Sequence, residues 1–302
     1  MIDRVIDEEQ GDTASPGSDA PPRSLIVTIY GLYARELGGW MSVSDLILLM
    51  AELGVDAQAV RSSVSRLKRR GILVSERRGS AAGYALSSYA RDVLGAGDRR
   101  IFARPANDDV DWVVAVFSVP ESERQKRHAL RARLTWLGFG TVTAGVWIAP
   151  GHLVDDTREV LAAEGLDTYV DLFRADHLGF GATVDKVARW WDLDALDGLY
   201  RDFLAVQAPV LERWQAAGEP SGADGAAFAD YVRALTAWRR FPYLDPGLPA
   251  GLLPEGWSGT RAADTFFELR RLLAGPAHDF AVDRTAVDRT AVDRTAVDRT
   301  AG

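Results

Sequence analysis

The stretch DAQAVRSSVSRLKRRGILVSERRGSAAG, residues 56–83, decides how the first part of the chain folds. Asp56 can cap a helix, and Gly71 can end that helix in a left-handed turn. Between them Val60, Val64 and Leu67 recur at helical spacing, so one face of the helix is predicted to be buried. We therefore expect an amphipathic helix whose other face carries the serines and arginines of the stretch.

The same stretch is a basic island in an acidic protein. It carries seven Lys or Arg against two Asp or Glu as far as Arg78, whereas the whole chain has a net charge of −8. A local excess of positive charge of this kind is typical of a nucleic-acid contact. Arginines on the exposed face can reach phosphates or pair with guanine. The predicted DNA-binding residues are Arg61, Ser62, Ser65, Arg66 and Arg69 on the helix, and Arg77 and Arg78 beyond it.

The flanking segments complete a DNA-binding domain at residues 24–105. Ser24 can cap a helix that ends near Gly38, and Ser42 begins a capping box before a second helix that ends at Gly54. After the basic helix, short strands at 72–74 and 84–86 are predicted to form a loose hairpin that carries the last two arginines. Three helices followed by a basic hairpin indicate a winged helix-turn-helix.

Residues 110–178 show a different pattern. Buried-type strands at 112–117, 141–143, 145–148 and 168–173 alternate with helices that begin near Pro120 and Leu153. The order β-α-β-β-α-β predicts a ferredoxin-like domain. Five basic residues between Arg124 and Arg133 form either a solvated outer face or an auxiliary phosphate contact.

The remainder of the chain completes an α+β protein. Residues 179–278 are rich in helix-spaced aromatic residues and indicate a mostly helical C-terminal domain. Residues 1–23 are expected to be a disordered acidic arm. Residues 279–302 hold four identical copies of AVDRT, whose period of five keeps no face apolar. We expect this tail to be disordered or nascent-helical.

Composition excludes several classes of protein. The chain has no cysteine, which removes disulfides and cysteine-ligated zinc, and its four histidines follow no metal-binding spacing. It has no run of about 18 apolar residues that could span a membrane, and no secretory signal. We expect a cytoplasmic protein without a metal, a cofactor or a membrane partner.

Several motifs carry a resemblance to the PaaX family of phenylacetate-degradation repressors. They are SLIVTIYGLY, AVRSSVSRLKRRGIL and SERRG at the start, FSVPES and LRARLTWLGFGTVTAGVWIAP in the middle, and the DPGLPAGLLPEGW run near the end. The resemblance covers residues 24–275. It implies that the third helix is a recognition helix, that the hairpin is a wing, and that the middle domain is similar in fold to the small nuclease of CRISPR adaptation. Ser118 stands where such a nuclease would need an acidic metal ligand.

The resemblance also implies a function. Family members are repressors that act as homodimers on double-stranded operator DNA and leave it when they bind an aryl-acyl-CoA, phenylacetyl-CoA in the namesake members. A pocket for such a ligand needs arginines close to aromatic rings. The candidates are Trp238, Arg239 and Arg240, with Arg174 and His177 from the middle domain. A helix end that is simply packed by Trp238 explains the same pattern.

Two other functions fit parts of the sequence. An enzyme acting on a CoA thioester or on nucleic acid would need a nucleophile and a base in one pocket. Asp176 could orient the imidazole of His177, although an adjacent pair of this kind is more often structural. A DNA-binding scaffold without a small-molecule effector would need neither. The resemblance favours a repressor that is not an enzyme.

Overall fold

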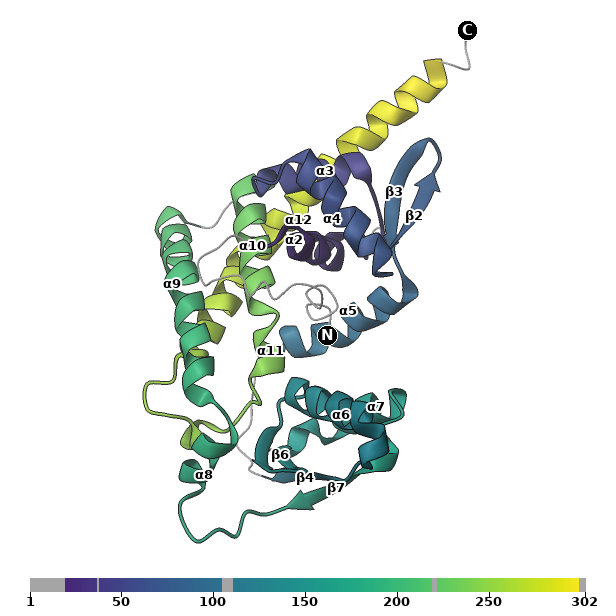
Figure 1. The fold of residues 1–302 in the computed structure, drawn as a ribbon. Coiled ribbons are helices and arrows are strands. Elements are labelled where there is room, and N and C mark those ends of the chain that lie inside the picture. The colour runs from purple at the N-terminus through teal and green to yellow at the C-terminus, as the bar shows by residue number, and fades with distance from the viewer. Residues whose placement is uncertain (1–19, 37, 105–110, 219–221, 299–302) are drawn as a thin grey trace. The chain divides into compact units, whose positions relative to one another are not determined.

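The computed structural model describes residues 20–36, 38–104, 111–218 and 222–298, with side chains described through residue 285. They mix helices with two small sheets, as expected for an α+β protein (Figure 1). The chain divides into two compact units. Unit 1 comprises Met1–Phe102, Asp202–Arg239 and Arg261–Gly302, and unit 2 comprises Ala103–Arg201 and Arg240–Thr260. The units cut across the three domains drawn from the sequence, because C-terminal helices share a core with N-terminal ones.

Unit 1 begins with a compact α/β arrangement. In chain order its elements are α2 (Pro22–Ile29), the π-helical turn η1 (Tyr30–Ala34), β1 (Trp40–Ser42), α3 (Val43–Glu52), α4 (Ala57–Arg69), β2 (Leu73–Arg78), β3 (Ala81–Leu86) and α5 (Ser88–Ile101). The three strands form an antiparallel sheet in the order β1-β3-β2.

The start of unit 1 differs from the sequence prediction in three ways. The first helix begins at Pro22, and Ser24 is buried within it, where its carbonyl accepts a hydrogen bond from the Thr28 hydroxyl (3.1 Å). Strand β1 and helix α5 were not predicted. A three-residue strand is too short to show a period, and Gly95 and Gly97 weaken the helical signal of α5. Residues 1–19 of the expected acidic arm lie outside the described residues.

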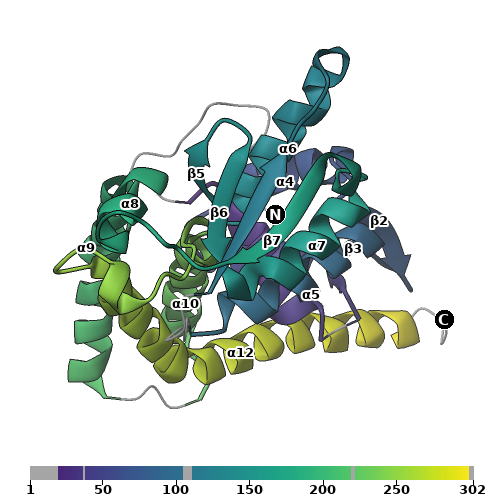
Figure 2. The same cartoon turned by 90° about the horizontal axis from the view of Figure 1, so that it is seen from below.

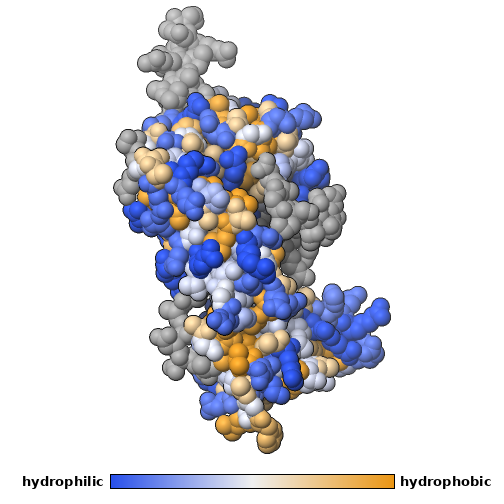
Figure 3. All heavy atoms as spheres, turned by 90° about the vertical axis from the view of Figure 1, so that its left-hand side faces the viewer, coloured by the Kyte–Doolittle hydropathy of each residue, from blue (hydrophilic) through white to orange (hydrophobic). Residues whose placement is uncertain are grey.

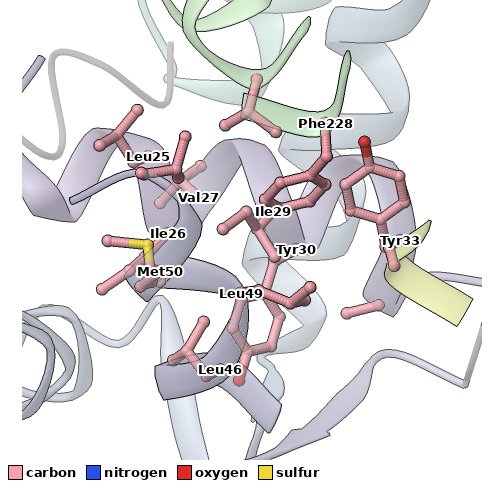
Figure 4. Packing of buried hydrophobic residues seen from close by; sticks show 14 of the residues in the cluster. Leu25, Ile26, Val27, Ile29, Tyr30, Tyr33, Leu46, Leu49, Met50 and Phe228 are labelled. Atoms are coloured by element: carbon pink, nitrogen blue, oxygen red, sulfur yellow. The ribbon is translucent and has the colours of Figure 1, made fainter. Parts of the chain in front are cut away.

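The core of unit 1 forms around α2. Ile29 and Tyr30 pack against Leu49 of α3, and Phe228 approaches them from α10 (Gly225–Trp238), as Figure 4 shows. The hydroxyls of Thr28 on α2 and Thr236 on α10 lie 2.7 Å apart, so a buried polar contact also joins these helices. The C-terminal region therefore supplies part of the core around the N-terminal helices.

Two long helices contribute to both units. They are α9 (Leu193–Ala217) and α12 (Ser258–Asp298). In unit 1, the Trp214 indole of α9 donates to Asp230 of α10 (2.9 Å), and the Trp238 ring stacks on Phe266 of α12 at 4.8 Å. These contacts bury the aromatic residues that the sequence placed in a helical core.

Unit 2 is built on a four-stranded antiparallel sheet, β5-β6-β4-β7 (Figure 2). Its elements are β4 (Trp112–Phe117), η2 (Glu121–Glu123), α6 (Arg124–Trp136), β5 (Gly140–Thr143), β6 (Val146–Pro150), η3 (Gly151–Leu153), α7 (Val154–Ala163), η4 (Asp167–Tyr169), β7 (Val170–Ala175), α8 (Thr183–Trp190), α11 (Phe241–Leu244) and η5 (Ala250–Leu252).

Alternation along the strands gives the sheet two apolar faces. Val113 and Ala115 of β4 pack with α6 and α7, whereas Trp112 and Val114 pack on the other side with Val187 of α8. Because successive strand residues point to opposite faces, the apolar run at 112–117 serves both layers.

The C-terminal tail continues helix α12 as far as the structure describes it. The backbone is helical through Asp298, as the end of α12. In the first AVDRT copy Ala281 and Thr285 are buried, and the Thr285 hydroxyl donates to the Ala281 carbonyl (3.0 Å). Residues four apart lie on one side of a helix, so this first copy has a covered face.

The described helices include none that is long and apolar enough to cross a membrane. Figure 3 shows polar residues spread over the face in view, with smaller apolar areas between them.

Candidate nucleic-acid interface

Helix α4 has the ends and the buried face that its sequence predicts. An Asp56 carboxylate oxygen accepts hydrogen bonds from the amides of Gln58 (2.8 Å) and Ala59 (2.9 Å), which satisfies two of the free donors at the start of the helix. Gly71 follows the helix with a φ of +69°. The buried face comprises Val60, Ser63, Val64 and Leu67. Ser63 is the one residue of this face that the apolar spacing did not reveal.

The opposite face of α4 is basic and exposed. Arg61, Ser62, Ser65, Arg66, Lys68 and Arg69 are all exposed. Within the part of the chain that the structure describes, Arg61, Arg66 and Arg69 make no ion pair or side-chain hydrogen bond. Three of the basic residues occupy the last turn, where positive charge is favoured by the helix dipole. Unpaired cations on a rigid helix are available to an anionic partner.

The hairpin beside α4 is more ordered than the loose connection expected from its sequence. Strands β2 and β3 pair as far as Arg78 and Ala81, which leaves a two-residue loop in which Gly79 has a φ of +59°. A positive φ is what short hairpin loops require. The tip of the hairpin is therefore a short turn between two paired strands.

The two hairpin arginines have different surroundings. Arg77 is exposed and donates to the Ser80 carbonyl at the tip (3.0 Å). Arg78 pairs with Glu76 (2.8 Å) and lies over the Trp40 ring at 5.2 Å. Arg78 thus contacts Glu76 on its own strand and Trp40 on β1, whereas Arg77 is presented at the tip.

Trp40 is the residue of this region that sequence reasoning missed. Its indole nitrogen donates to the Glu76 carbonyl of β2 (3.2 Å), and its ring covers Gly83 of β3. The Trp40 ring lies over β3 at Gly83, which has no side chain. Gly83 therefore allows β1 to approach β3 closely. The available signal was a short apolar pair, Trp40–Met41, between two glycines and the Ser42 cap.

The structure divides the predicted effector-binding residues between the two units. Trp238 and Arg239 belong to unit 1, where they are 3% and 4% exposed. Arg239 donates to the Thr28 hydroxyl (3.0 Å), and the Trp238 indole donates to the Ile101 carbonyl (3.1 Å). Both side chains are thus engaged in the interior of unit 1.

The other three candidates belong to unit 2. Arg240 is exposed and lies over the Phe241 ring at 5.4 Å. Arg174 pairs with Asp111 and remains 65% exposed. His177 contacts the Thr183 hydroxyl through Nδ1 (3.2 Å) and meets the Trp190 ring edge-on, contacts typical of a structural histidine.

Unit 2 also contains a half-buried acid, Asp245, in the DPGLP loop. The Asp245 carboxylate accepts hydrogen bonds from the Tyr200 hydroxyl (2.8 Å) and the Gly247 amide (2.7 Å). Burial raises the pKa of Asp245 above its usual range, although both hydrogen bonds oppose the shift. Tyr200 stacks on Phe241 at 4.3 Å. The loop is therefore anchored to α9 by polar and aromatic contacts.

The described residues contain no group of three or more His, Cys, Asp or Glu able to hold a metal ion. Ser118 is exposed just after β4, at the position where the resemblance called for an acidic ligand.

Known proteins resemble this chain over most of its length. Three family models match: "PaaX-like protein" over residues 21–90, "PaaX protein central Cas2-like domain" over 105–187 and "PaaX-like protein C-terminal domain" over 191–283. The chain is 25% identical over 269 residues to the Transcriptional repressor PaaX of Escherichia coli (strain K12), covering 86% of this chain and 83% of that protein. It shares a fold with the Uncharacterized protein Rv0674 from Mycobacterium tuberculosis, with a TM-score of 0.52, 23% identity, and coverage of 87% of this chain and 99% of that one. The chain belongs to the PaaX family.

Proposed function

We propose that this protein is a DNA-binding transcriptional repressor. The observation that carries the proposal is the exposed, unpaired basic face of α4, opposite a buried face and beside a hairpin with an arginine at its tip. In this proposal α3 and α4 form the helix-turn-helix, α4 enters the major groove, and β2–β3 is the wing. The similarity to a named repressor supports the same function.

In this proposal the DNA bases are contacted by Ser62, Ser65, Arg66 and Arg69. The two serines are short, which lets the backbone of α4 approach the bases, and the two arginines are long enough for bidentate contacts to guanine. Arg61 and Arg77 take phosphate contacts, and Arg78 takes one only by leaving Glu76.

Unit 2 contributes a scaffold in this proposal. The strand order β5-β6-β4-β7, with α6 and α7 packed in one layer and α8 in the other, supports a ferredoxin-like domain. A homodimer would place two recognition helices on two half-sites of one operator.

The effector in this proposal is an aryl-acyl-CoA, phenylacetyl-CoA or a similar thioester from an aromatic-acid catabolic operon. Such a ligand releases DNA only by binding the released state more tightly than the DNA-bound state. Of the predicted residues, Arg240 and Arg174 have exposed guanidinium groups that suit CoA phosphates. Replacing Arg174 and Arg240 with alanine changes only unit 2. Unlike a substitution of Arg239, it leaves the core of unit 1 intact.

The direct test is a binding assay with the DNA upstream of the protein's own gene, repeated with a panel of acyl-CoAs. We expect tight binding that an aryl-acyl-CoA abolishes, and we expect the Arg174→Ala/Arg240→Ala variant to bind DNA but to resist release. If the protein binds DNA but no acyl-CoA changes that binding, the result would favour a DNA-binding scaffold without a small-molecule effector. Thioester hydrolysis without DNA binding would contradict the proposal and favour an enzyme.

A further inference from the structure

The turn between α3 and α4 is held by two arginines from the C-terminal part of unit 1. Arg233 of α10 donates to the Leu53 carbonyl (3.1 Å), and Arg284 of α12 pairs with Glu52 at 2.9 Å. Glu52 is the last residue of α3, and Leu53 begins the turn. In Figure 1, α10 and α12 pass beside α3 at this end.

These contacts satisfy groups that the end of a helix leaves open. The last carbonyls of α3 lack partners within the helix, and a guanidinium is a suitable donor for them. Leu53 is only 5% exposed, so its carbonyl has little access to water. The Arg233 hydrogen bond therefore fixes the backbone at the point where the chain turns toward α4.

The segment that carries Arg284 is itself docked. Ala281 and Thr285 are buried on one side of α12, and His278 pairs with Glu36 (3.0 Å). Arg284 also lies over the Phe280 ring at 5.5 Å, which limits the positions its guanidinium can take. The first AVDRT copy is thus part of unit 1.

Ala281 and Thr285 lie four residues apart, so they share one side of the helix. A period of five residues, by contrast, turns successive positions by about 140° around an ideal helix axis, since each residue turns it by about 100°.

We propose that Arg233 and Arg284 are positioning residues for the recognition helix, so that sequence-specific DNA binding depends on the C-terminal part of the chain. The inference rests on the proposed function of α4. Bidentate contacts to a base need both partners within narrow limits of distance and angle, whereas phosphate contacts tolerate small displacements. Loss of the two arginines should therefore weaken binding to the specific site more than binding to random DNA.

The test compares full-length Arg233→Met/Arg284→Met with Arg289→Met, which changes the same residue of the second AVDRT copy. Affinity is measured for the protein's own upstream DNA and for random DNA of equal length. We expect the double variant to lose roughly tenfold on the specific DNA and little on the random DNA. The Arg289 variant should match the wild type. An equal loss on both DNAs, or no loss on either, overturns the proposal.

A measurement without DNA separates this inference from the proposed function. Amide hydrogen exchange at residues 53–56 should be faster in the double variant and unchanged in the Arg289 variant. Exchanging the charges of one pair, Glu52→Arg with Arg284→Glu, should restore slow exchange that Arg284→Glu alone loses. If exchange at the turn is the same in all variants, the Arg233 and Arg284 contacts do not hold the turn, whatever the DNA results. If the wild type binds no DNA but exchange responds as expected, the proposed function fails, whereas the stabilisation of the turn by Arg233 and Arg284 is confirmed.

Discussion

Replacing Gly83 with alanine tests how the predicted wing is built. A Cβ atom added at Gly83 would lie 2.5 Å from two atoms of the Trp40 ring, and closer still to the Met41 carbonyl oxygen. Real Cβ atoms do not approach other atoms so closely, so β1 would have to move away from β3. That movement would strain the β1–β3 pairing and the contact of Arg78 with the Trp40 ring.

The expected loss follows from the cost of overpacking. Forcing extra atoms into a packed site costs about 1–3 kcal/mol. For a unit of roughly 150–250 residues, each kcal/mol lowers the melting midpoint by about 2–4 °C, so the variant should melt about 2–12 °C lower. Gly95→Ala is the matched control, because a Cβ there meets nothing within 4 Å and Gly95 lies within helix α5. It should stabilise by up to about 1 kcal/mol.

Scanning calorimetry on the two variants and the wild type gives the answer. We expect the order Gly95→Ala, wild type, Gly83→Ala from the highest midpoint to the lowest. A Gly83→Ala protein that melts at or above the wild type would refute the close packing of β1 on β3.

Three further predictions concern single contacts. Arg77→Ala should weaken binding equally on specific and random DNA and flatten the slope of log affinity against log salt by about one phosphate contact; an unchanged slope would remove Arg77 from the interface. Tyr200→Phe should destabilise unit 2 by about 1–3 kcal/mol, because it leaves a buried oxygen of Asp245 without its partner; an unaltered urea midpoint would argue against that hydrogen bond. The pKa of His278 is raised, chiefly by its hydrogen bond to Glu36. A histidine whose pKa is raised by folding stabilises the folded state fully when the pH is below its ordinary pKa of 6.5. It loses that effect as the pH rises through the pKa of the folded state. His278→Gln should therefore lower the melting midpoint more at about pH 6 than at about pH 8.5, and an equal effect at both would show that the ion pair does not stabilise the fold.

Local signals in the sequence were sufficient for many of the elements. The cap at Asp56, the spacing of Val60, Val64 and Leu67, and the buried run at 112–117 each depend on near neighbours along the chain. Capping and periodicity act over four or five residues, so these elements could be predicted without knowledge of the fold.

Contacts between distant segments gave no such signal. Trp40 reaches β2 across 36 residues, and Arg239 reaches Thr28 across 211. The sequence placed Arg239 in an effector site because a cation beside aromatic residues fits both a ligand pocket and a packed helix end. Only the fold distinguishes the two, since it shows Arg239 buried against α2.

The proposed DNA-binding face of α4 could be predicted in part from local signals. Periodicity separated the exposed arginines of α4 from its buried residues, and the structure places Arg66 and Arg69 on the exposed side. Which cations remain unpaired depends on where the acidic residues fold. Glu76 pairs with Arg78, because residues two apart on strand β2 point to the same face of the sheet.

The most direct test of the account is the affinity of Arg66→Ala and Arg69→Ala for the DNA upstream of the protein's own gene, with Arg99→Ala on helix α5 as the control. Arg99 is also an exposed arginine of unit 1 but lies outside α4 and the hairpin. We predict that each α4 variant loses about 1–3 kcal/mol, or roughly five- to 150-fold in affinity, and that Arg99→Ala binds like the wild type. Wild-type affinity in both α4 variants, with their melting midpoints unchanged, would contradict the assignment of α4 as the recognition helix.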